Sequence, residues 1–348
     1  MSFRSDQGAG LSRLACRTGV GMMLAMAIAV TQPWLRADER SAEIRALSIA
    51  ASGLESIDAS RRLVRDALDG GFNTLLLPIA LEGDANPDRD AAIEAVIRDA
   101  RERGLRVHAS IRAIVASEPG DLPASRDHAI YRHPDWLMVP RELAIEMLDL
   151  DPRSPDYIGR LSRWTRAHAN RADGLYVSPF QPEAVDYIAR AVTELVARYP
   201  VDGVLLDGLR LPGLDFDYSR GTLDVFRATA RRALDEAARA RLDAIEAIDP
   251  FGYPEELAEE WRRFRIARLS GLVARLRTAV RSVRPEAIVS AGVEPGAERA
   301  LDAYLQDWRT WLDNGLVDAL SPGGGAGVTR LLFSYDTLLD AAPATASH

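Results

Sequence analysis

The chain has 348 residues and a formal net charge of −8, and all 43 of its basic residues are arginine. Because lysine is absent, a Schiff-base or lysine-base mechanism is excluded, and the acidic balance argues against a nucleic-acid partner. The one cysteine is Cys16, so the chain beyond it has no disulfide, no thiol nucleophile and no cysteine metal site.

Residues 1–37 have the pattern of a signal peptide. Arginines near the amino terminus precede an apolar run from Gly19 to Val30, and the small residue Ala37 follows that run. The run is too short for a stable membrane span, which needs about 20 apolar residues. We therefore expect an exported protein, periplasmic or extracellular, with no stable membrane span after signal cleavage.

Residues 38–340 are expected to form a single domain, followed by a disordered tail over residues 341–348. Short apolar runs of strand length alternate there with amphipathic segments of helical spacing. The predicted strands are Ile44–Gly53, Phe72–Ala80, Arg106–Ile114, Gly203–Leu206, Ala287–Val293, Val317–Leu320 and Leu331–Ser334.

This alternation predicts an α/β fold with a parallel sheet and helices outside it. About seven strands are one short of a TIM-type (β/α)8 barrel, so the sequence predicts an incomplete barrel of this type. The missing unit falls in residues 321–330, where the sequence Pro-Gly-Gly-Gly supplies only a linker.

Two carboxylates follow predicted strands, at the ends where barrel enzymes place their functional groups. Asp207 follows the apolar run Gly203–Leu206, and Glu294 follows the next strand, Ala287–Val293. A carboxylate pair at one barrel mouth suits glycosidic-bond hydrolysis, in which one acid protonates the leaving oxygen and the other attacks or activates water. The structural alternative is that either acid caps a helix or pairs with one of the many arginines.

Five further side chains are candidates for substrate binding. Arg210 and Tyr218 lie on the charged loop after the predicted strand Gly203–Leu206, although Arg210 suits an ordinary ion pair equally well. His108 lies near the end of the third predicted strand, where it can face the mouth. His133 and Trp136 belong to the sequence HPDW, in which the indole offers a stacking surface for a sugar. For each of these three a packed, hydrogen-bonded role is the alternative.

Motifs for metal or cofactor binding are not found. No set of His, Asp and Glu has convincing spacing for metal ligands, and a GxSxG elbow, a P-loop and a GxGxxG motif after a strand are absent. The sequence therefore predicts no metal and no cofactor.

Several motifs together resemble a known family. The stretch Val201–Ser219, VDGVLLDGLRLPGLDFDYS, is similar to the strand-and-loop signature of the bacterial glycosyl-hydrolase-like 10 family. The resemblance covers nearly all of the chain after the predicted signal peptide. Further similar motifs are GFNTLLL at Gly71–Leu77, GDA at Gly83–Ala85, VHA at Val107–Ala109, HPDWLM at His133–Met138, LYVSPFQPE at Leu175–Glu183, QDWRTWLDNGLVDALSP at Gln306–Pro322 and LLFSYDTL at Leu331–Leu338.

The resemblance implies an exported (β/α)8 barrel that hydrolyses glycosides, with bacterial cell-wall glycan as the substrate class. It maps the family's motif aspartate onto Asp207 and its motif arginine onto Arg210. The chain departs from the pattern at Gly208 and Leu211, where the family usually has aromatic residues. Its last motif also follows the sixth barrel strand directly, which implies that the seventh βα unit is missing.

Two functions of different kinds fit the sequence. The first is a secreted glycoside hydrolase that uses Asp207 with Glu294, either retaining or inverting. The second is a non-catalytic relative that keeps the cleft and binds polysaccharide or peptidoglycan glycan. A purely structural envelope protein without a ligand is a third alternative.

Overall fold

The computed structural model describes residues 44–332, except 55, 83–85, 119 and 324–326. The predicted signal peptide, the predicted tail and the GDA motif lie outside the described residues. The described residues form a seven-stranded sheet in the order β8-β7-β6-β3-β2-β1-β9. Its strands are β1 (Ile44–Ser48), β2 (Thr74–Pro78), β3 (Arg106–Arg112), β6 (Gly203–Asp207), β7 (Ile288–Val293), β8 (Ala319–Pro322) and β9 (Gly327–Leu331).

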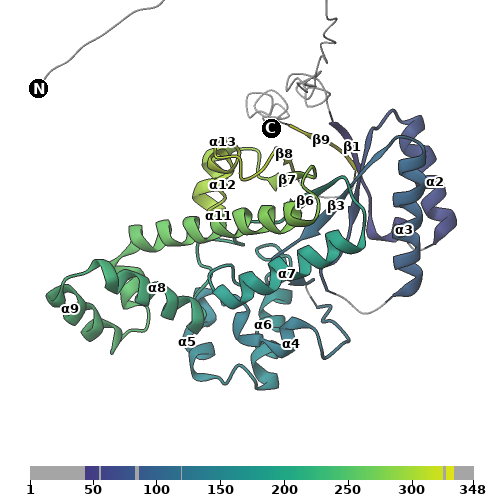
Figure 1. Ribbon diagram of the computed structural model, residues 1–348. Helices are drawn as coiled ribbons and strands as arrows, with labels where there is room; N and C mark the ends of the chain where they lie inside the picture. Colours follow the sequence, from purple (N-terminus) through teal and green to yellow (C-terminus); the bar gives the residue numbers. More distant parts are fainter. Residues whose placement is uncertain (1–43, 55, 83–85, 119, 324–326, 333–348) are drawn as a thin grey trace, which may run out of the picture. The chain divides into compact units, whose positions relative to one another are not determined.

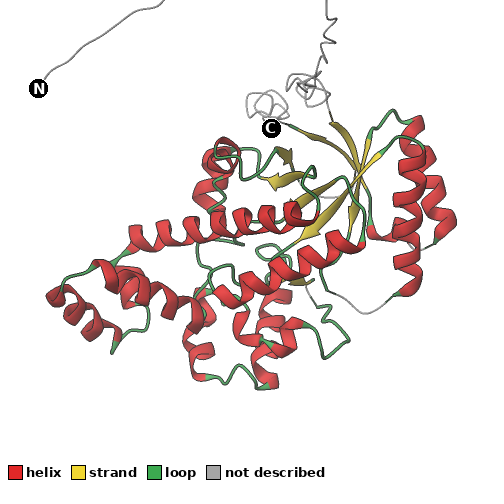
Figure 2. Ribbon diagram, in the orientation of Figure 1, coloured by secondary structure: helices red, strands yellow, loops and turns green. Residues whose placement is uncertain are grey.

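Helices pack on the outer face of this sheet, where Figures 1 and 2 show α2 beside α3 and α7 beside α11. Of the helices in the described ranges, none is both long and apolar enough to cross a membrane. The helices are η1 (Ala51–Leu54), α2 (Ile57–Asp69), α3 (Pro87–Glu102), α4 (Ala129–Arg132), η2 (Pro134–Trp136), α5 (Arg141–Asp149), α6 (Pro155–Ala167), α7 (Pro182–Arg198), α8 (Arg220–Ala233), α9 (Glu236–Glu246), α10 (Gly252–Glu256), α11 (Ala258–Val283), α12 (Ala297–Tyr304) and α13 (Trp308–Asp313).

Local sequence accounts for the positions of several elements. The apolar runs of β2 and β6 are buried on both faces, as expected of strands inside a helix-covered parallel sheet. Asn86 caps α3 by accepting the Arg89 N–H at 3.0 Å, and Pro87 occupies the first turn, where its missing N–H costs nothing. Leu305 ends α12 with a φ of 56°, a left-handed conformation that separates this helix from α13.

The last strand closes the sheet by running against its neighbours. β1, β2, β3, β6, β7 and β8 are parallel, whereas β9 pairs with β1 in the antiparallel sense from Ile44–Leu331 to Ser48–Gly327. Leu332, just after β9, exchanges two backbone hydrogen bonds of 2.8 Å with Leu320 of β8. The result is a nearly closed barrel-like sheet of seven strands, which confirms the prediction of an incomplete barrel.

The position of β9 differs from the sequence prediction. The strand begins at Gly327, within the stretch predicted as a linker, rather than at Leu331. The reason is that backbone pairing with the edge of β1 holds this segment, and such pairing requires no apolar pattern in the strand itself.

The interior of the sheet is packed with side chains in layers. Strand register places Leu76, His108, Gly203 and Ile288 side by side on one level. An apolar cluster fills the inside: Ile44, Ala46, Leu76, Leu205, Ala319 and Leu331. His108 is fully buried there, and neither ring nitrogen has a hydrogen-bond partner among the described residues.

Between β3 and α7 the chain makes a long excursion, much of which is regular secondary structure. β4 (Val115–Ser117) and β5 (Leu175–Tyr176) pair as a separate antiparallel sheet. Helices α4, α5 and α6 pack around their own apolar cluster, which includes Ile130, Leu161 and Phe251. This excursion supplies several side chains above the carboxyl ends of β2 and β3.

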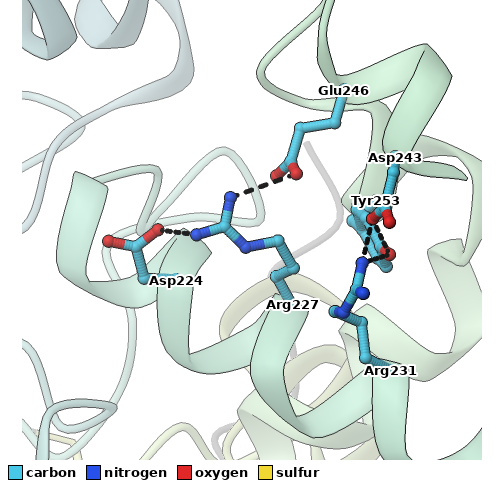
Figure 3. A network of polar contacts seen from close by, with 6 residues as sticks. All are labelled: Asp224, Arg227, Arg231, Asp243, Glu246 and Tyr253. Carbon is cyan, nitrogen blue, oxygen red and sulfur yellow. Dashed lines mark hydrogen bonds and ion pairs between the residues drawn. The ribbon is translucent and has the colours of Figure 1, made fainter. Parts of the chain in front are cut away.

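Helices α8, α9 and α10 are joined by arginine–carboxylate pairs (Figure 3). Arg227 of α8 reaches Glu246 of α9 at 3.1 Å. Arg231 pairs with Asp243, and the hydroxyl of Tyr253 in α10 donates to the same carboxylate at 2.8 Å. In a chain without lysine, the planar guanidinium group provides these multiple contacts.

The layer that contains His108 leads to a prediction about stability. A Cβ atom added at Gly203 would lie 2.7 Å from the His108 ring and 2.7 Å from the Ile288 carbonyl oxygen. Gly203→Ala is therefore expected to lower the free energy of unfolding by about 1–3 kcal/mol, as measured by urea denaturation.

Gly271→Ala is the matched control, because no atom lies within 4 Å of a Cβ built there in α11. Alanine favours the helix, so this variant is expected to gain about 0.5–1 kcal/mol. A Gly203→Ala protein as stable as the wild type would contradict the packing described for the sheet interior.

Candidate active site

A cavity of about 440 Å³ opens at the carboxyl ends of β6 and β7, and we call it the acid cavity. Asp207 is the last residue of β6, and Glu294 directly follows β7, so both line this cavity. The structure thus brings together the two carboxylates that the strand ends predicted. The lining residues are Arg112, Asp173, Tyr176, Asp207, Gly208, Arg210, Gly292, Val293, Glu294, Pro295, Gln306 and Gly323.

The environment of the Asp207 carboxyl group raises its pKa. Burial raises its pKa above the ordinary value of 3.8, and the negative charge of Asp173 adds to this effect. The charges of Arg112 and Arg210 and a 2.9 Å hydrogen bond from the Gly208 N–H to Oδ1 act in the opposite direction without cancelling it. This is the environment that a general acid needs.

Two glycines make room for the Asp207 carboxyl group. Gly208 has a φ of +66°, a left-handed conformation that side chains rarely adopt, so glycine suits this position better than the aromatic residue of the family pattern. A Cβ atom at Gly292 of β7 would lie 2.6 Å from Asp207 Oδ1. The close approach of β7 to this carboxyl group therefore also depends on glycine.

Arg112 and Asp173 belong to the site, although sequence analysis did not select them. Arg112 is the register partner of Asp207 on β3, and its guanidinium pairs with Asp173 and, at 4.0 Å, with Glu118. The Tyr176 hydroxyl donates to Asp173. Burial, and then the charge of Asp173, raise the pKa of Tyr176, so this hydroxyl keeps its proton.

Glu294 is fixed through its backbone by residues from the last part of the chain. Its N–H donates to Gln306 Oε1 at 2.9 Å, and its carbonyl oxygen accepts from the Trp308 indole at 3.0 Å. Gln306 is buried and also donates to the carbonyls of Leu209 and Gly292, both at 3.1 Å. One side chain thereby ties the loop after β6 to the end of β7.

The carboxylate of Glu294 is partly exposed and has an ion-pair partner of its own. Its side chain is 22% exposed, and its Oε1 lies 3.5 Å from Nε of the exposed Arg299. Arg210, the predicted binding arginine, also lines the cavity, with its guanidinium 4.5 Å from the centre of the Tyr304 ring. The site therefore combines two carboxylates in different environments with the guanidinium group of Arg210, which lies against the Tyr304 ring.

The other sequence candidates lie elsewhere. His108 is inside the sheet, four residues before Arg112 on β3, and burial followed by the charge of Arg106 lowers its pKa to about 4. It is neutral and does not reach the mouth, because Arg112 is the residue that β3 presents there. Tyr218 packs edge-on against Phe251 and Trp261 and lines neither the acid cavity nor the cavity beside it.

His133 and Trp136 are stacked on each other, with ring centroids 3.8 Å apart. Trp136 is buried and lines a second cavity, which shares only Arg112 with the acid cavity. Within the described residues, no group of three His, Cys, Asp or Glu side chains has an arrangement that could hold a metal ion.

Comparison with known proteins agrees with this geometry. Residues 157–323 match the family model described as Glycosyl hydrolase-like 10, a narrower range than the motifs suggested. Glycosyl hydrolase DigH of Escherichia coli K12 is 26% identical over 272 residues, which cover 73% of this chain and 50% of that protein. Glycosyl hydrolase YngK of Bacillus subtilis 168 is 24% identical over 221 residues, or 58% of this chain and 37% of that protein. The chain thus spans about half the length, or less, of these relatives.

A solved structure shares the fold. The β-galactosidase from the psychrophilic Marinomonas ef1 aligns with 80% of this chain and 40% of its own, at a TM-score of 0.51 and 9% sequence identity. The matched residues 157–323 contain Asp207, Arg210 and Glu294. The resemblance to the glycosyl hydrolase-like 10 family that the motifs predicted is thereby confirmed over residues 157–323.

Proposed function

We propose that this protein is an exported glycoside hydrolase that cleaves a polysaccharide, with cell-wall glycan as its substrate class. The observation that carries the proposal is the pair Asp207 and Glu294 at one cavity, the first with a raised pKa and the second partly exposed beside Arg299. Two carboxylates with different environments are what hydrolysis of a glycosidic bond requires. The glycosyl hydrolase-like family match supports the same reaction class.

In the proposed reaction Asp207 is the general acid. Its Oδ1 accepts the Gly208 N–H, which leaves Oδ2 to carry the proton and donate it to the leaving glycosidic oxygen. Glu294 then attacks the anomeric carbon or activates a water molecule, and the separation of the two carboxyl groups around the bound sugar decides between retention and inversion. Arg210 is placed to bind a polar group of the glycan.

Export is supported by the sequence, and the cell-wall substrate class by the family resemblance. The arginine-flanked apolar run of residues 1–37 supports passage across a membrane. The names of the relatives DigH and YngK support a glycosyl hydrolase and specify no substrate.

A second function, glycan binding without cleavage, is favoured by one observation. Leu211 stands where the family pattern has an aromatic residue, and the structure places it fully buried, with its N–H bonded to the Tyr304 carbonyl at 3.1 Å. The acid cavity therefore lacks an aromatic surface at this position. A cavity that keeps its charges but has lost this contact suits a binding protein.

Replacing Asp207 with asparagine tests the catalytic assignment. Asn keeps the shape and the Gly208 hydrogen bond but cannot donate the proton, so kcat is expected to fall about a hundredfold to ten-thousandfold. The assay is release of soluble fragments from peptidoglycan glycan strands stripped of their peptides. Asp313→Asn, at an exposed aspartate on α13, is the matched control and should retain full activity.

Full activity of the Asp207→Asn protein would rule out the proposed mechanism. Retention of the glycan by both proteins, with no fragments released by the wild type, would establish the binding function in its place.

The pH profile provides a second test, with opposite signs for two variants. Because Asp207 must be protonated, kcat/KM is expected to fall as pH rises through its pKa. Arg112→Gln removes a cation and leaves Asp173 without its ion pair, which raises the pKa of Asp207 and moves the fall in kcat/KM to higher pH. Asp173→Asn removes an anion and releases Arg112, which lowers the pKa of Asp207 and moves the fall in kcat/KM to lower pH.

Each displacement is expected to be about one pH unit or less, since Arg112 is partly exposed to solvent. If the fall in kcat/KM moved in the same direction in both variants, a group other than Asp207 would control the pH profile.

A further inference from the structure

A second cavity, of about 330 Å³, lies above the carboxyl ends of β2 and β3, and we call it the tryptophan cavity. It shares the Arg112 side chain with the acid cavity, so the two are neighbours on the same mouth. Most of its wall is apolar. The apolar lining includes Pro78, Ile79, Leu81, Ala113, Val115, Trp136, Val177 and Ile188.

Two buried polar atoms in this wall have no hydrogen-bond partner among the described residues. They are Glu82 Oε1 and Ser117 Oγ, and the Ser117 residue is only 9% exposed. A buried polar group without a partner is costly, so such atoms usually mark a place where a ligand or water completes the bonding. Neither atom takes part in the chemistry proposed for the acid cavity.

The Glu82 side chain is held in place through its other oxygen. Oε2 accepts the Ala129 N–H at 2.8 Å and lies 3.4 Å from Nε2 of His128. Burial, followed by a hydrogen bond to the Glu82 side chain and the charge of Glu82, raises the pKa of Tyr187 to about 12, so this hydroxyl stays protonated beside the carboxylate. Glu82 Oε1 is therefore a fixed acceptor rather than a mobile surface group.

An aromatic surface lies in the same wall. The Trp136 ring is 5.5 Å from the Tyr187 ring, and His133 is stacked behind it at 3.8 Å. Sugars present apolar C–H faces together with hydroxyl groups, so an aromatic wall with a few fixed polar atoms matches them well. The ionic side chains of the wall, Glu82, Glu118, Arg89 and Arg112, balance in charge, which favours an uncharged sugar.

We propose that the tryptophan cavity is a second glycosyl-binding site, which holds a further uncharged unit of the glycan strand bound at Asp207. A sugar hydroxyl donates to Glu82 Oε1, and Ser117 Oγ bonds to another hydroxyl. Arg112 forms the wall common to both cavities, so one strand crosses it from one cavity to the other. This inference rests on the proposed function in one respect, that the acid cavity takes glycan.

The test is a comparison of ligand lengths in proteins that cannot turn over. Isothermal titration calorimetry would measure Kd for the disaccharide and the pentasaccharide of β-1,4-linked N-acetylglucosamine with the Asp207→Asn protein. The pentasaccharide is expected to bind more tightly. Adding Glu82→Gln, which keeps the size and the Ala129 bond, should weaken pentasaccharide binding about tenfold, and adding Ser117→Ala about threefold, because each removes a hydrogen bond.

Glu102→Gln, at an exposed glutamate on α3, is the matched control and should leave both Kd values unchanged. Unchanged pentasaccharide affinity in both test variants, or no binding by the Asp207→Asn parent, would overturn the second site.

The outcomes separate this inference from the proposed function. If the wild type hydrolyses the glycan and the Ser117→Ala enzyme has an unaltered KM, the proposed function is supported and the second site is ruled out. Weaker binding in the Glu82 and Ser117 variants, with no hydrolysis by any protein, would establish the site in a chain that only binds glycan.

Discussion

The barrel-like sheet depends on a strand that runs against all the others. An open parallel sheet would leave the edges of β1 and β8 unpaired, and such edges invite association with other chains. β9 pairs along β1, and the bonds between Leu320 and Leu332, together with the 3.0 Å contact between the Ser321 and Thr329 hydroxyls, join it to β8. A short antiparallel strand thus takes the place of a complete βα unit.

This closure determines which part of the mouth carries functional groups. The carboxyl ends of β2, β3, β6 and β7 remain side by side, and the two cavities lie above them. β9 is antiparallel to β1, so its carboxyl end lies at the opposite side of the sheet from those of the parallel strands. The chemistry is therefore concentrated on one side of the barrel, over strands whose register is fixed by parallel pairing.

The electrostatics of the acid cavity depend on which carboxylates pair with Arg112. Its ion pairs are with Asp173 and Glu118, and the Tyr176 hydroxyl supports Asp173 in that position. The charge of Arg112 therefore lowers the pKa of Asp207 by less than burial raises it, and burial is the dominant influence on this pKa. An acid whose pKa stays raised near a cation requires such a competing anion.

The sequence predicted the features that depend on local pattern. The buried strands and the positions of Asp207 and Glu294 at strand ends follow from apolar runs of strand length. The pairing of Arg112 with Asp173 was not predictable, because 61 residues separate the two and only the tertiary fold brings them together. Tyr218 was misleading for the same reason, since its place against Phe251 and Trp261 is set by helices that follow it in the chain.

The measurement that tests the central claim most directly is a crystal structure of the Asp207→Asn protein with a bound oligosaccharide of β-1,4-linked N-acetylglucosamine. The account predicts a glycosidic oxygen within about 3 Å of the residue 207 side chain, with Glu294 on the opposite side of the same sugar. An oligosaccharide bound elsewhere on the protein, with the acid cavity left without sugar, would contradict it.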